Sequence, residues 1–436
     1  MRRRSSTGSK FCRLPRLQGC CFLMNDQDAR FCIRNREPPP DTPVLPIPER
    51  PIILGSIQET KVRHSNPPTD VYRALQERID ELPVPYPSTE SGVEIKLLKA
   101  LFEEHEAELA LHLSAIGEPV SVIARRVPGG DPVEIESTLA ALARKGAINT
   151  GVTRVGKERV RTYGLAPLVV GMFEFQVDRL TPEFVHDFHD YLDDGFRKSI
   201  VGVQTPQMRT VPVRAQLSAG RSVSLYDDIR SYLSSHPGPF SVINCVCRQS
   251  AELIGEPCTT SSTHETCLMI GHTPPHGREV TREELLAILD RSEREGQVLQ
   301  PQNTRRPAFI CCCCRDCCEL LRNARKLPRP ADAIPSAHRA AVAPSICTGC
   351  RVCVKRCPMD AITVENRIAV IDEARCIGCA LCTTTCPVNA ISLVRRRRAP
   401  RTPRTAVSMY LRMYRDRWGF RKIASLAVRK LIGRKI

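Results

Sequence analysis

Apolar positions recur at helical spacing in the first third of the chain. Tyr72, Leu75 and Ile79 share one helical face after Asp70, and we expect this helix to stop before Pro83. The same spacing continues through Leu97, Leu98, Leu101, Phe102, Leu109, Leu111 and Leu113. The pattern predicts several short helices that bury their apolar faces in a common core.

A capped helix and two strands are predicted next. Asp131-Pro132-Val133-Glu134 supplies an N-cap acid, a first-turn proline and a glutamate at the third position. Gly146 can end this helix in a left-handed conformation. Residues 147–150 and 159–164 are then predicted to form two strands that turn near Gly156.

The order of these elements resembles a winged helix over about residues 93–165, with a short helix at 120–127 before the capped one. Winged helices often bind DNA, so a redox-sensing regulator has to be considered. The predicted recognition helix carries Glu134 and Glu136 near its N-terminal turn, where acids repel phosphate. We therefore do not expect DNA as a partner and favour a docking module, although the wing carries Arg154, Lys157, Arg159 and Arg161.

The pattern changes in the middle of the chain. Residues 169–177 are apolar and predict a strand or a buried segment, and the proline-rich stretch 37–51 predicts an extended arm. Three further helices are predicted, one from Thr181 to about Lys198, one over 225–233 and one from the capping box at Thr281 through Leu289.

Charge is concentrated at the C-terminal end. Residues 395–436 carry 15 Lys or Arg and one acid, so this tail contributes +14 of the total net charge of +17 and the rest only +3. The tail from Met409 to Ile432 is expected to be either an amphipathic helix or a solvated end. As a helix it would bind an anionic membrane surface or an acidic redox partner.

The 22 cysteines are clustered at metal-ligand spacing, which favours a reducing interior over a secreted disulfide scaffold. No apolar run approaches the roughly 20 residues of a membrane span. No apolar stretch follows Met1-Arg2-Arg3-Arg4, which argues against a secretory signal. We expect a cytoplasmic protein, with peripheral contact at the inner membrane face as an option for the tail. Met24 is an alternative start, and Cys12, Cys20, Cys21 and Cys32 are expected to be unused thiols.

Two near-copies of one cysteine pattern follow each other at an offset of 29 residues. Each is C-x2-C-x2-C-x3-C-P, the first beginning at Cys347 and the second at Cys376. Three thiolates at this spacing wrap one face of a cubane iron–sulfur cluster, and the fourth, before the proline, reaches the other cluster. Eight ligands imply two [4Fe–4S] clusters: Cys347, Cys350, Cys353, Cys357, Cys376, Cys379, Cys382 and Cys386.

Residues from about 345 to 394 resemble a bacterial-type two-cluster ferredoxin domain. The resemblance implies a crossed ligand set, with Cys386 joining the first three cysteines of the first motif and Cys357 joining those of the second. It also implies that Gly349 and Gly378 leave room for each cubane. Two four-thiolate zinc sites are the alternative, but zinc does not need this triple spacing twice.

A second group of ten cysteines lies between Cys245 and Cys318. The four consecutive ones from Cys311 to Cys314 cannot all reach one ion, because neighbouring side chains point apart. We predict a site that combines Cys245 or Cys247 with Cys314 and Cys317 and holds a third iron–sulfur cluster or a structural zinc. Buried, unliganded thiols are the alternative for this group, which also contains Cys258, Cys267, Cys312, Cys313 and Cys318.

These patterns predict an α+β multidomain protein. The expected segments are a poorly ordered arm (1–68), a winged-helix-like α/β domain (69–200), a mixed Cys-rich middle domain (201–327), a linker (328–344), a two-cluster ferredoxin-like domain (345–394) and a basic amphipathic tail (395–436).

We expect a non-catalytic iron–sulfur electron-transfer subunit that passes electrons to or from a partner oxidoreductase. The alternatives are a redox-sensing winged-helix DNA-binding regulator and an oxidoreductase that uses a further metal site in the middle domain. The sequence contains no P-loop and no G-x-G-x-x-G fingerprint, so no nucleotide cofactor is expected.

Overall fold

The computed structural model describes residues 70–200, 203–213, 227–274, 276–431 and 434–435. The expected arm at 1–68, with Cys12, Cys20, Cys21 and Cys32, lies outside these residues. Helices and sheets are mixed, which agrees with the predicted α+β class, and Ser65–Ile436 form one compact unit.

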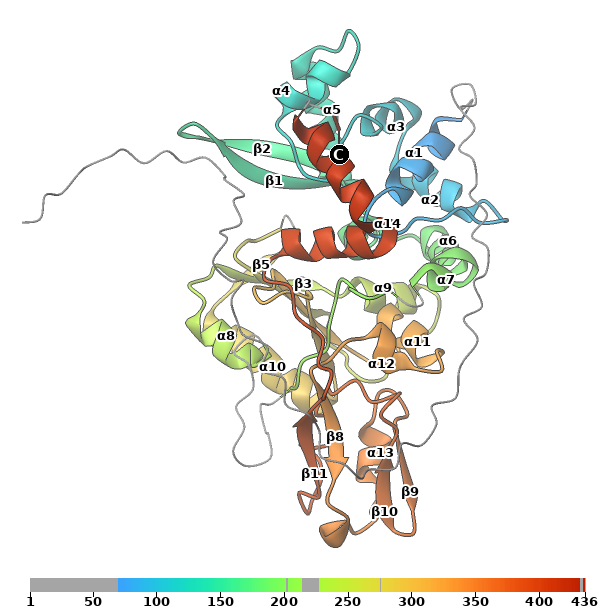
Figure 1. Cartoon of the computed structure of the whole chain (residues 1–436), viewed down its shortest axis with the longest axis vertical. Helices are drawn as coiled ribbons and strands as arrows, with labels where there is room; N and C mark the ends of the chain where they lie inside the picture. The colour runs from blue at the N-terminus through green and yellow to red at the C-terminus, as the bar shows by residue number, and fades with distance from the viewer. Residues whose placement is uncertain (1–69, 201–202, 214–226, 275, 432–433, 436) are drawn as a thin grey trace, which may run out of the picture. The chain divides into compact units, whose positions relative to one another are not determined.

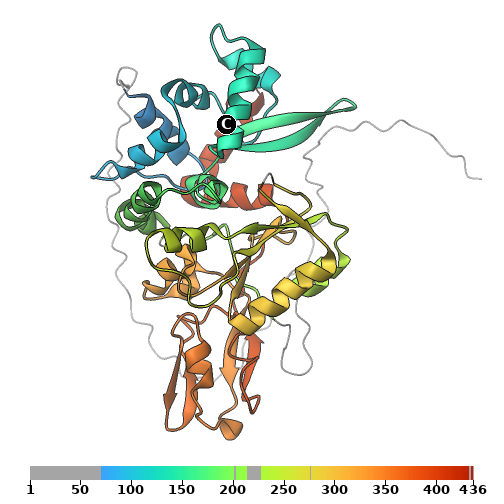
Figure 2. The ribbon, with the colours of Figure 1, turned by 180° about the vertical axis from the view of Figure 1, so that it is seen from behind.

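The first described region is helical and ends in a hairpin. It contains α1 (Val71–Asp80), α2 (Val93–Leu101), α3 (Glu104–Ala110), α4 (Val120–Ile123), the 3-10 turn η1 (Ala124–Arg126) and α5 (Pro132–Lys145). Asp131 caps α5, and Gly146 ends it with a positive φ of 72°. The strands β1 (Ile148–Val155) and β2 (Glu158–Leu165) pair antiparallel and form a long hairpin (Figure 2). The predicted helices and both strands are confirmed.

The strand alternative for residues 169–177 is wrong. The chain forms a π-type turn, η2 (Leu168–Met172), and a 3-10 turn, η3 (Glu174–Gln176), before α6 (Pro182–Tyr191). Val170 has a positive φ, and the Glu174 carboxylate accepts a hydrogen bond from the Gly171 N–H at 2.8 Å, which closes the turn. The apolar pattern reflects burial, as the second alternative stated. The predicted helix from Thr181 continues through η4 (Leu192–Phe196) and α7 (Arg197–Ile200).

The middle region is built on a five-stranded antiparallel sheet in the order β5-β3-β4-β7-β6. Its strands are β3 (Phe240–Asn244), β4 (Glu265–Ile270), β5 (Arg278–Val280), β6 (Val298–Pro301) and β7 (Phe309–Cys313). Its helices are α8 (Ile229–Ser235), α9 (Val246–Leu253) and α10 (Arg282–Glu295), and α8 and α10 run side by side (Figures 1 and 2). The capping box predicted at Thr281 is confirmed, since its side chain accepts from the Glu284 N–H.

The cysteine repeat lies between two small antiparallel strand pairs (Figure 1). One pair joins β8 (His338–Val342) to β11 (Ile391–Arg395), and the other joins β9 (Ile362–Glu365) to β10 (Ile368–Ile371). The helical elements here are α11 (Glu319–Arg325), α12 (Pro330–Ala333), η5 (Pro344–Ile346) and α13 (Val352–Arg356). The segment predicted as a linker, 328–344, contains α12 and β8, because β8 completes the sheet that β11 begins.

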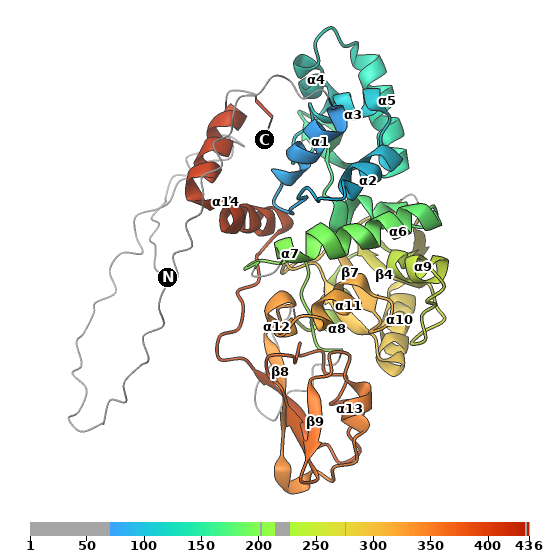
Figure 3. The ribbon, with the colours of Figure 1, turned by 90° about the vertical axis from the view of Figure 1, so that its right-hand side faces the viewer.

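The basic tail forms α14 (Ala406–Leu431), which bends at Gly419 with its φ of 74° (Figure 3). Met409 and Met413 are buried in the core of the first helical region, so this face of the helix is already covered. Arg417 pairs with Asp80 at 2.7 Å. The tail is therefore helical, as one of the two alternatives predicted. None of the described helices has the length and apolar character needed to cross a bilayer.

Candidate iron–sulfur and thiol sites

The two cysteine motifs are held by matching hydrogen bonds. The first cysteine of each motif accepts a backbone N–H at 3.4 Å, Cys347 from Ala369 and Cys376 from Ala340. The two donors are 29 residues apart, as are the two cysteines. The structural repeat therefore extends beyond the motif to the strands β8 and β10. Hydrogen bonds to sulfur of this kind raise the reduction potential of a bound cluster.

The last cysteine of each motif is held in the same way. Cys357 accepts the N–H of Ala361 at 3.3 Å, and Cys386 accepts the N–H of Ala390 at 3.2 Å. In both cases the donor lies four residues after the sulfur, just past the proline. The chain thus turns back on itself at each Cys-Pro unit and presents the thiol to the neighbouring motif.

A glycine is required inside each motif. Gly349 and Gly378 have φ angles of 68° and 67°, a conformation that a Cβ atom disfavours. A Cβ on Gly349 would lie 2.6 Å from the carbonyl oxygen of Arg367, and one on Gly378 would lie 2.2 Å from that of His338. Each glycine therefore allows the cysteine loop to pack directly against β10 or β8.

The structure brings together the first of the two crossed sets. Cys347, Cys350 and Cys353 line one small cavity with Cys386, although Cys386 belongs to the other motif. In the second set, Cys357, Cys376 and Cys379 influence one another electrostatically and also act on Cys382. Three triple-spaced thiols, one thiol from the other motif and inward N–H groups fit the ligand requirement of a [4Fe–4S] cluster.

The two sets differ in exposure. Cys376, Cys379, Cys382 and Cys357 are all buried, whereas Cys350 of the other set is exposed. Burial raises the pKa of Cys382 and of Cys357 above the usual thiol range. These thiols would therefore remain protonated without a metal, and metal binding would release their protons.

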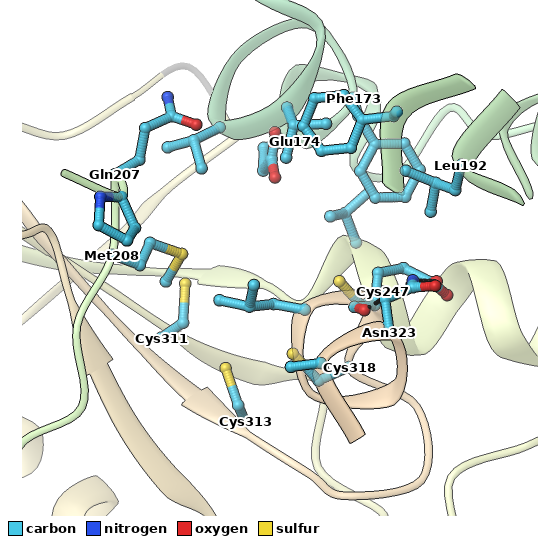
Figure 4. Close-up of a pocket in the computed structure, with 18 of the residues that line it drawn as sticks. Phe173, Glu174, Leu192, Gln207, Met208, Cys247, Cys311, Cys313, Cys318 and Asn323 are labelled. Atoms are coloured by element: carbon cyan, nitrogen blue, oxygen red, sulfur yellow. Dashed lines mark hydrogen bonds between the residues drawn. The ribbon is translucent and has the colours of Figure 1, made fainter. Parts of the chain in front are cut away.

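Most of the middle cysteines surround a cavity of about 190 Å³. Cys311 and Cys313, alternate residues of β7, direct their sulfur atoms toward it together with Cys318 and Cys247 (Figure 4). Phe173, Glu174 and Leu192 from the first helical region form the opposite wall (Figure 4). Cys267 lies beside Cys311, with their sulfur atoms 3.9 Å apart. The result is a row of thiols along one wall of an enclosed, mostly apolar chamber.

Strand alternation explains which of the consecutive cysteines reach the cavity. Cys312 lies between Cys311 and Cys313 in β7, is 2% exposed and interacts with Ser292 of α10. Successive side chains of a strand point to opposite faces, so Cys312 cannot share a ligand with its neighbours. The expectation that the consecutive cysteines divide between sites is consistent with this arrangement.

A different set of middle cysteines is compact. Among the described residues, Cys258, Cys314, Asp316 and Cys317 have ligand atoms that all lie within 4.8 Å of one another. The predicted site paired Cys314 and Cys317 with Cys245 or Cys247, and this grouping is wrong. The reason is that the loop after α9 carries Cys258 back to the turn between β7 and α11, while Cys247 belongs to the cavity wall.

Two arginines were missed by the sequence analysis. Arg248 donates to the Cys314 sulfur at 3.0 Å although it is only 1% exposed, and Arg315 donates to the Cys357 carbonyl oxygen at 3.2 Å. The only signal in the sequence was that each directly follows a cysteine, at Cys247 and Cys314. Such adjacency does not show which distant sulfur the guanidinium will meet.

Comparison with known proteins gives one finding. Residues 346–390 match the family model of a 4Fe-4S dicluster domain. No match was found among the curated proteins or among the solved structures. The dicluster domain and the many cysteines together support 4Fe-4S cluster binding and an iron–sulfur electron-transfer role for this chain.

Proposed function

We propose that this protein is an electron-transfer subunit in which two [4Fe–4S] clusters relay electrons between a partner redox protein and the cysteine-rich middle region. One cluster would be held by Cys347, Cys350, Cys353 and Cys386, and the other by Cys376, Cys379, Cys382 and Cys357. The carrying observation is the repeated cradle, in which paired N–H donors and paired glycines recur at the 29-residue offset. When bound, such clusters accept and release one electron at a time.

The exposure of the two sets supports a direction for the relay. Cys350 is exposed next to Arg351, and Val352 and Val388 on the same cavity rim are 40% and 38% exposed. Exposed apolar side chains beside a cation fit a partner whose docking face is partly apolar and acidic. Electrons would enter or leave at this rim, and the buried set would connect to the interior of the protein.

A second candidate function is an oxidoreductase whose redox centre lies at the cavity. It is supported by the row of thiols in Figure 4 and by the contact of the neighbouring turn with the buried cluster set. The mostly apolar walls would exclude water from such a centre. Cys247, Cys311, Cys313 and Cys318 would be its first ligands, and Glu174 is a proton-carrying group on the opposite wall.

Anaerobic iron and acid-labile sulfide analysis of the full chain tests the main proposal. We expect about eight irons and eight sulfides per chain if only the two motifs are loaded, and about twelve of each if a further cubane occupies the cavity. Colourless protein with zinc in the motif thiols would exclude the relay.

The crossed assignment needs single variants. Cys357→Ser should remove the EPR signal of the buried cluster and leave that of the exposed one, and Cys386→Ser should do the reverse. Cys312→Ser is the matched control, because this buried cysteine faces α10 and belongs to neither motif. Loss of the same signal in both motif variants would contradict the crossing.

A further inference from the structure

The turn between β7 and α11 holds a compact group of thiols apart from the cavity. Cys314 and Cys317 come from this turn and are each 1% exposed, and Cys258 comes from the loop after α9. The ligand atoms of these three cysteines and of Asp316 lie within 4.8 Å of one another. Two segments more than 50 residues apart in the sequence are therefore joined at one point through sulfur.

The size of this group distinguishes a single ion from a cluster. Around one tetrahedral zinc ion, with Zn–S bonds of about 2.3 Å and Zn–O bonds of about 2.0 Å, ligand atoms lie about 3.5–3.8 Å apart. The Cys258 sulfur and Asp316 Oδ1 are 3.5 Å apart. In a cubane each thiolate binds its own iron, so the ligand sulfurs are necessarily farther from one another. The group therefore has the dimensions of a one-ion site.

Asp316 is positioned by its other oxygen. Its Oδ2 accepts hydrogen bonds from the backbone N–H of Thr259 at 2.6 Å, from the Thr259 hydroxyl at 2.7 Å and from the Thr260 N–H at 3.0 Å. Its Oδ1 accepts the Cys317 N–H at 3.0 Å and the Cys258 thiol. The carboxylate thus ties the Cys258 loop to the turn and keeps Oδ1 beside the three sulfurs.

A buried cation beside the group indicates that the sulfurs carry negative charge. Arg248 is 1% exposed and donates through Nη2 to the Cys314 sulfur at 3.0 Å, while its Nε and Nη1 have no hydrogen-bond partner. A guanidinium buried without a carboxylate is costly unless an anion lies next to it. Three thiolates and a carboxylate around a divalent ion have a net charge of −2, which this arginine would partly neutralise.

We propose that Cys258, Cys314, Cys317 and Asp316 bind a single structural zinc ion, distinct from the iron–sulfur ligands and from the cavity thiols. The ion would fasten the Cys258 loop to the turn that carries Arg315. Since Arg315 contacts the backbone of Cys357, the zinc would also fix one side of the buried cluster set. This inference extends the proposed function but does not depend on it, because zinc and iron are counted separately.

Metal analysis of the full chain, purified without oxygen, provides the test. We expect about one zinc per chain in addition to iron, retained in Cys312→Ser and lost in Cys317→Ser and in Cys258→Ser. Iron content should stay unchanged in all three variants. Zinc absent from the native chain, or retained in both ligand variants, would overturn the proposal.

Cobalt substitution gives a second readout that does not require the ligand variants to fold. Co(II) exchanged into the native chain should give an intense thiolate-to-cobalt charge-transfer absorption, and X-ray absorption at the cobalt edge should fit about three sulfurs and one oxygen. A cobalt shell with only nitrogen and oxygen ligands would overturn the site. Limited proteolysis should also cut the Cys258 loop faster after zinc removal, whereas a loop held by hydrogen bonds alone would not respond.

Discussion

Arg315 Nη1 donates a hydrogen bond to the carbonyl oxygen of Cys357 at 3.2 Å. The same guanidinium pairs through Nη2 with Asp360 at 2.9 Å. Arg315 directly follows Cys314, and Cys357 belongs to the buried cluster set, so one side chain connects the middle cysteines to the cysteine repeat. The cores agree with this link, because Cys312 and Cys313 pack in the same hydrophobic cluster as Cys353 and Cys357.

Replacing Arg315 should shift the potential of one cluster. The reduced cluster carries one more negative charge than the oxidised one, so a nearby cation favours reduction. Arg315→Gln is expected to lower the reduction potential of the buried cluster by tens of millivolts, on the order set by one partly screened charge. A redox titration followed by EPR measures this value.

The control for Arg315 is Arg329→Gln, because Arg329 pairs with Asp332 on the surface of the middle region. It should leave both potentials unchanged. An equal shift of both clusters in Arg315→Gln would contradict the assignment of this arginine to the Cys357 side.

Adding a methyl group at Gly378 should disrupt the buried cluster site. The new Cβ would lie 2.2 Å from the His338 carbonyl oxygen, so β8 would have to move, and with it the Ala340 N–H that donates to Cys376. Gly378→Ala is expected to lose about four irons per chain or to lower the thermal midpoint strongly. Gly255→Ala is the matched control, since it has the same sign of φ but nothing within 4 Å of a new Cβ. That variant should cost only about 1 kcal/mol of backbone strain, and similar behaviour of the two variants would contradict the steric argument.

Stability should depend on the protonation of Glu174. Burial beside the cavity raises the pKa of this carboxyl to about 7, although the Gly171 N–H bound to it acts in the opposite direction. The unfolded chain has a value of about 4.3, so the folded protein binds the proton more tightly. The resulting stability is complete below about pH 4.3 and is lost as the pH rises through about 7, by on the order of 3 kcal/mol at most.

Thermal unfolding midpoints across this pH range check the Glu174 prediction. Glu174→Gln should flatten the decline between about pH 4.3 and 7, because the neutral amide does not titrate. Glu136→Gln, on the exposed face of α5, should keep the slope of the native chain. A steeper decline in Glu174→Gln would show that the carboxylate is charged and paired in the folded protein.

Arg417 should hold the tail helix against the first helical region. It pairs with Asp80, donates to the Leu82 carbonyl oxygen at 2.8 Å and also contacts the Asp80 carbonyl oxygen, which caps the end of α1. Arg417→Ala is expected to destabilise this contact by about 1–3 kcal/mol. Hydrogen exchange in α14 should then become faster near Met413, whereas Arg421→Ala, at an exposed position, should leave it unchanged. Unchanged exchange in both variants would mean that Met409 and Met413 suffice to dock the helix.

Local signals in the sequence were enough where the physics is local. Asp131 and Gly146 bound α5 because capping and left-handed termination depend on a few neighbouring residues. The cysteine repeat was likewise legible, since a cubane imposes its ligand spacing on a short stretch of chain. Residues 169–177 failed because an apolar run does not distinguish a buried strand from buried turns, and the side chain of Glu174 decided in favour of the turns.

Only the tertiary structure decided which distant thiols meet. Strand alternation sends Cys311 and Cys313 to the cavity and Cys312 to α10, and the loop after α9 returns Cys258 to Cys314 and Cys317. The partners of Arg248 and Arg315 depend on the same long-range packing. Ligand spacing within a motif is a property of the backbone over a few residues, whereas a site assembled from separate loops exists only when the sheet and helices have placed those loops together.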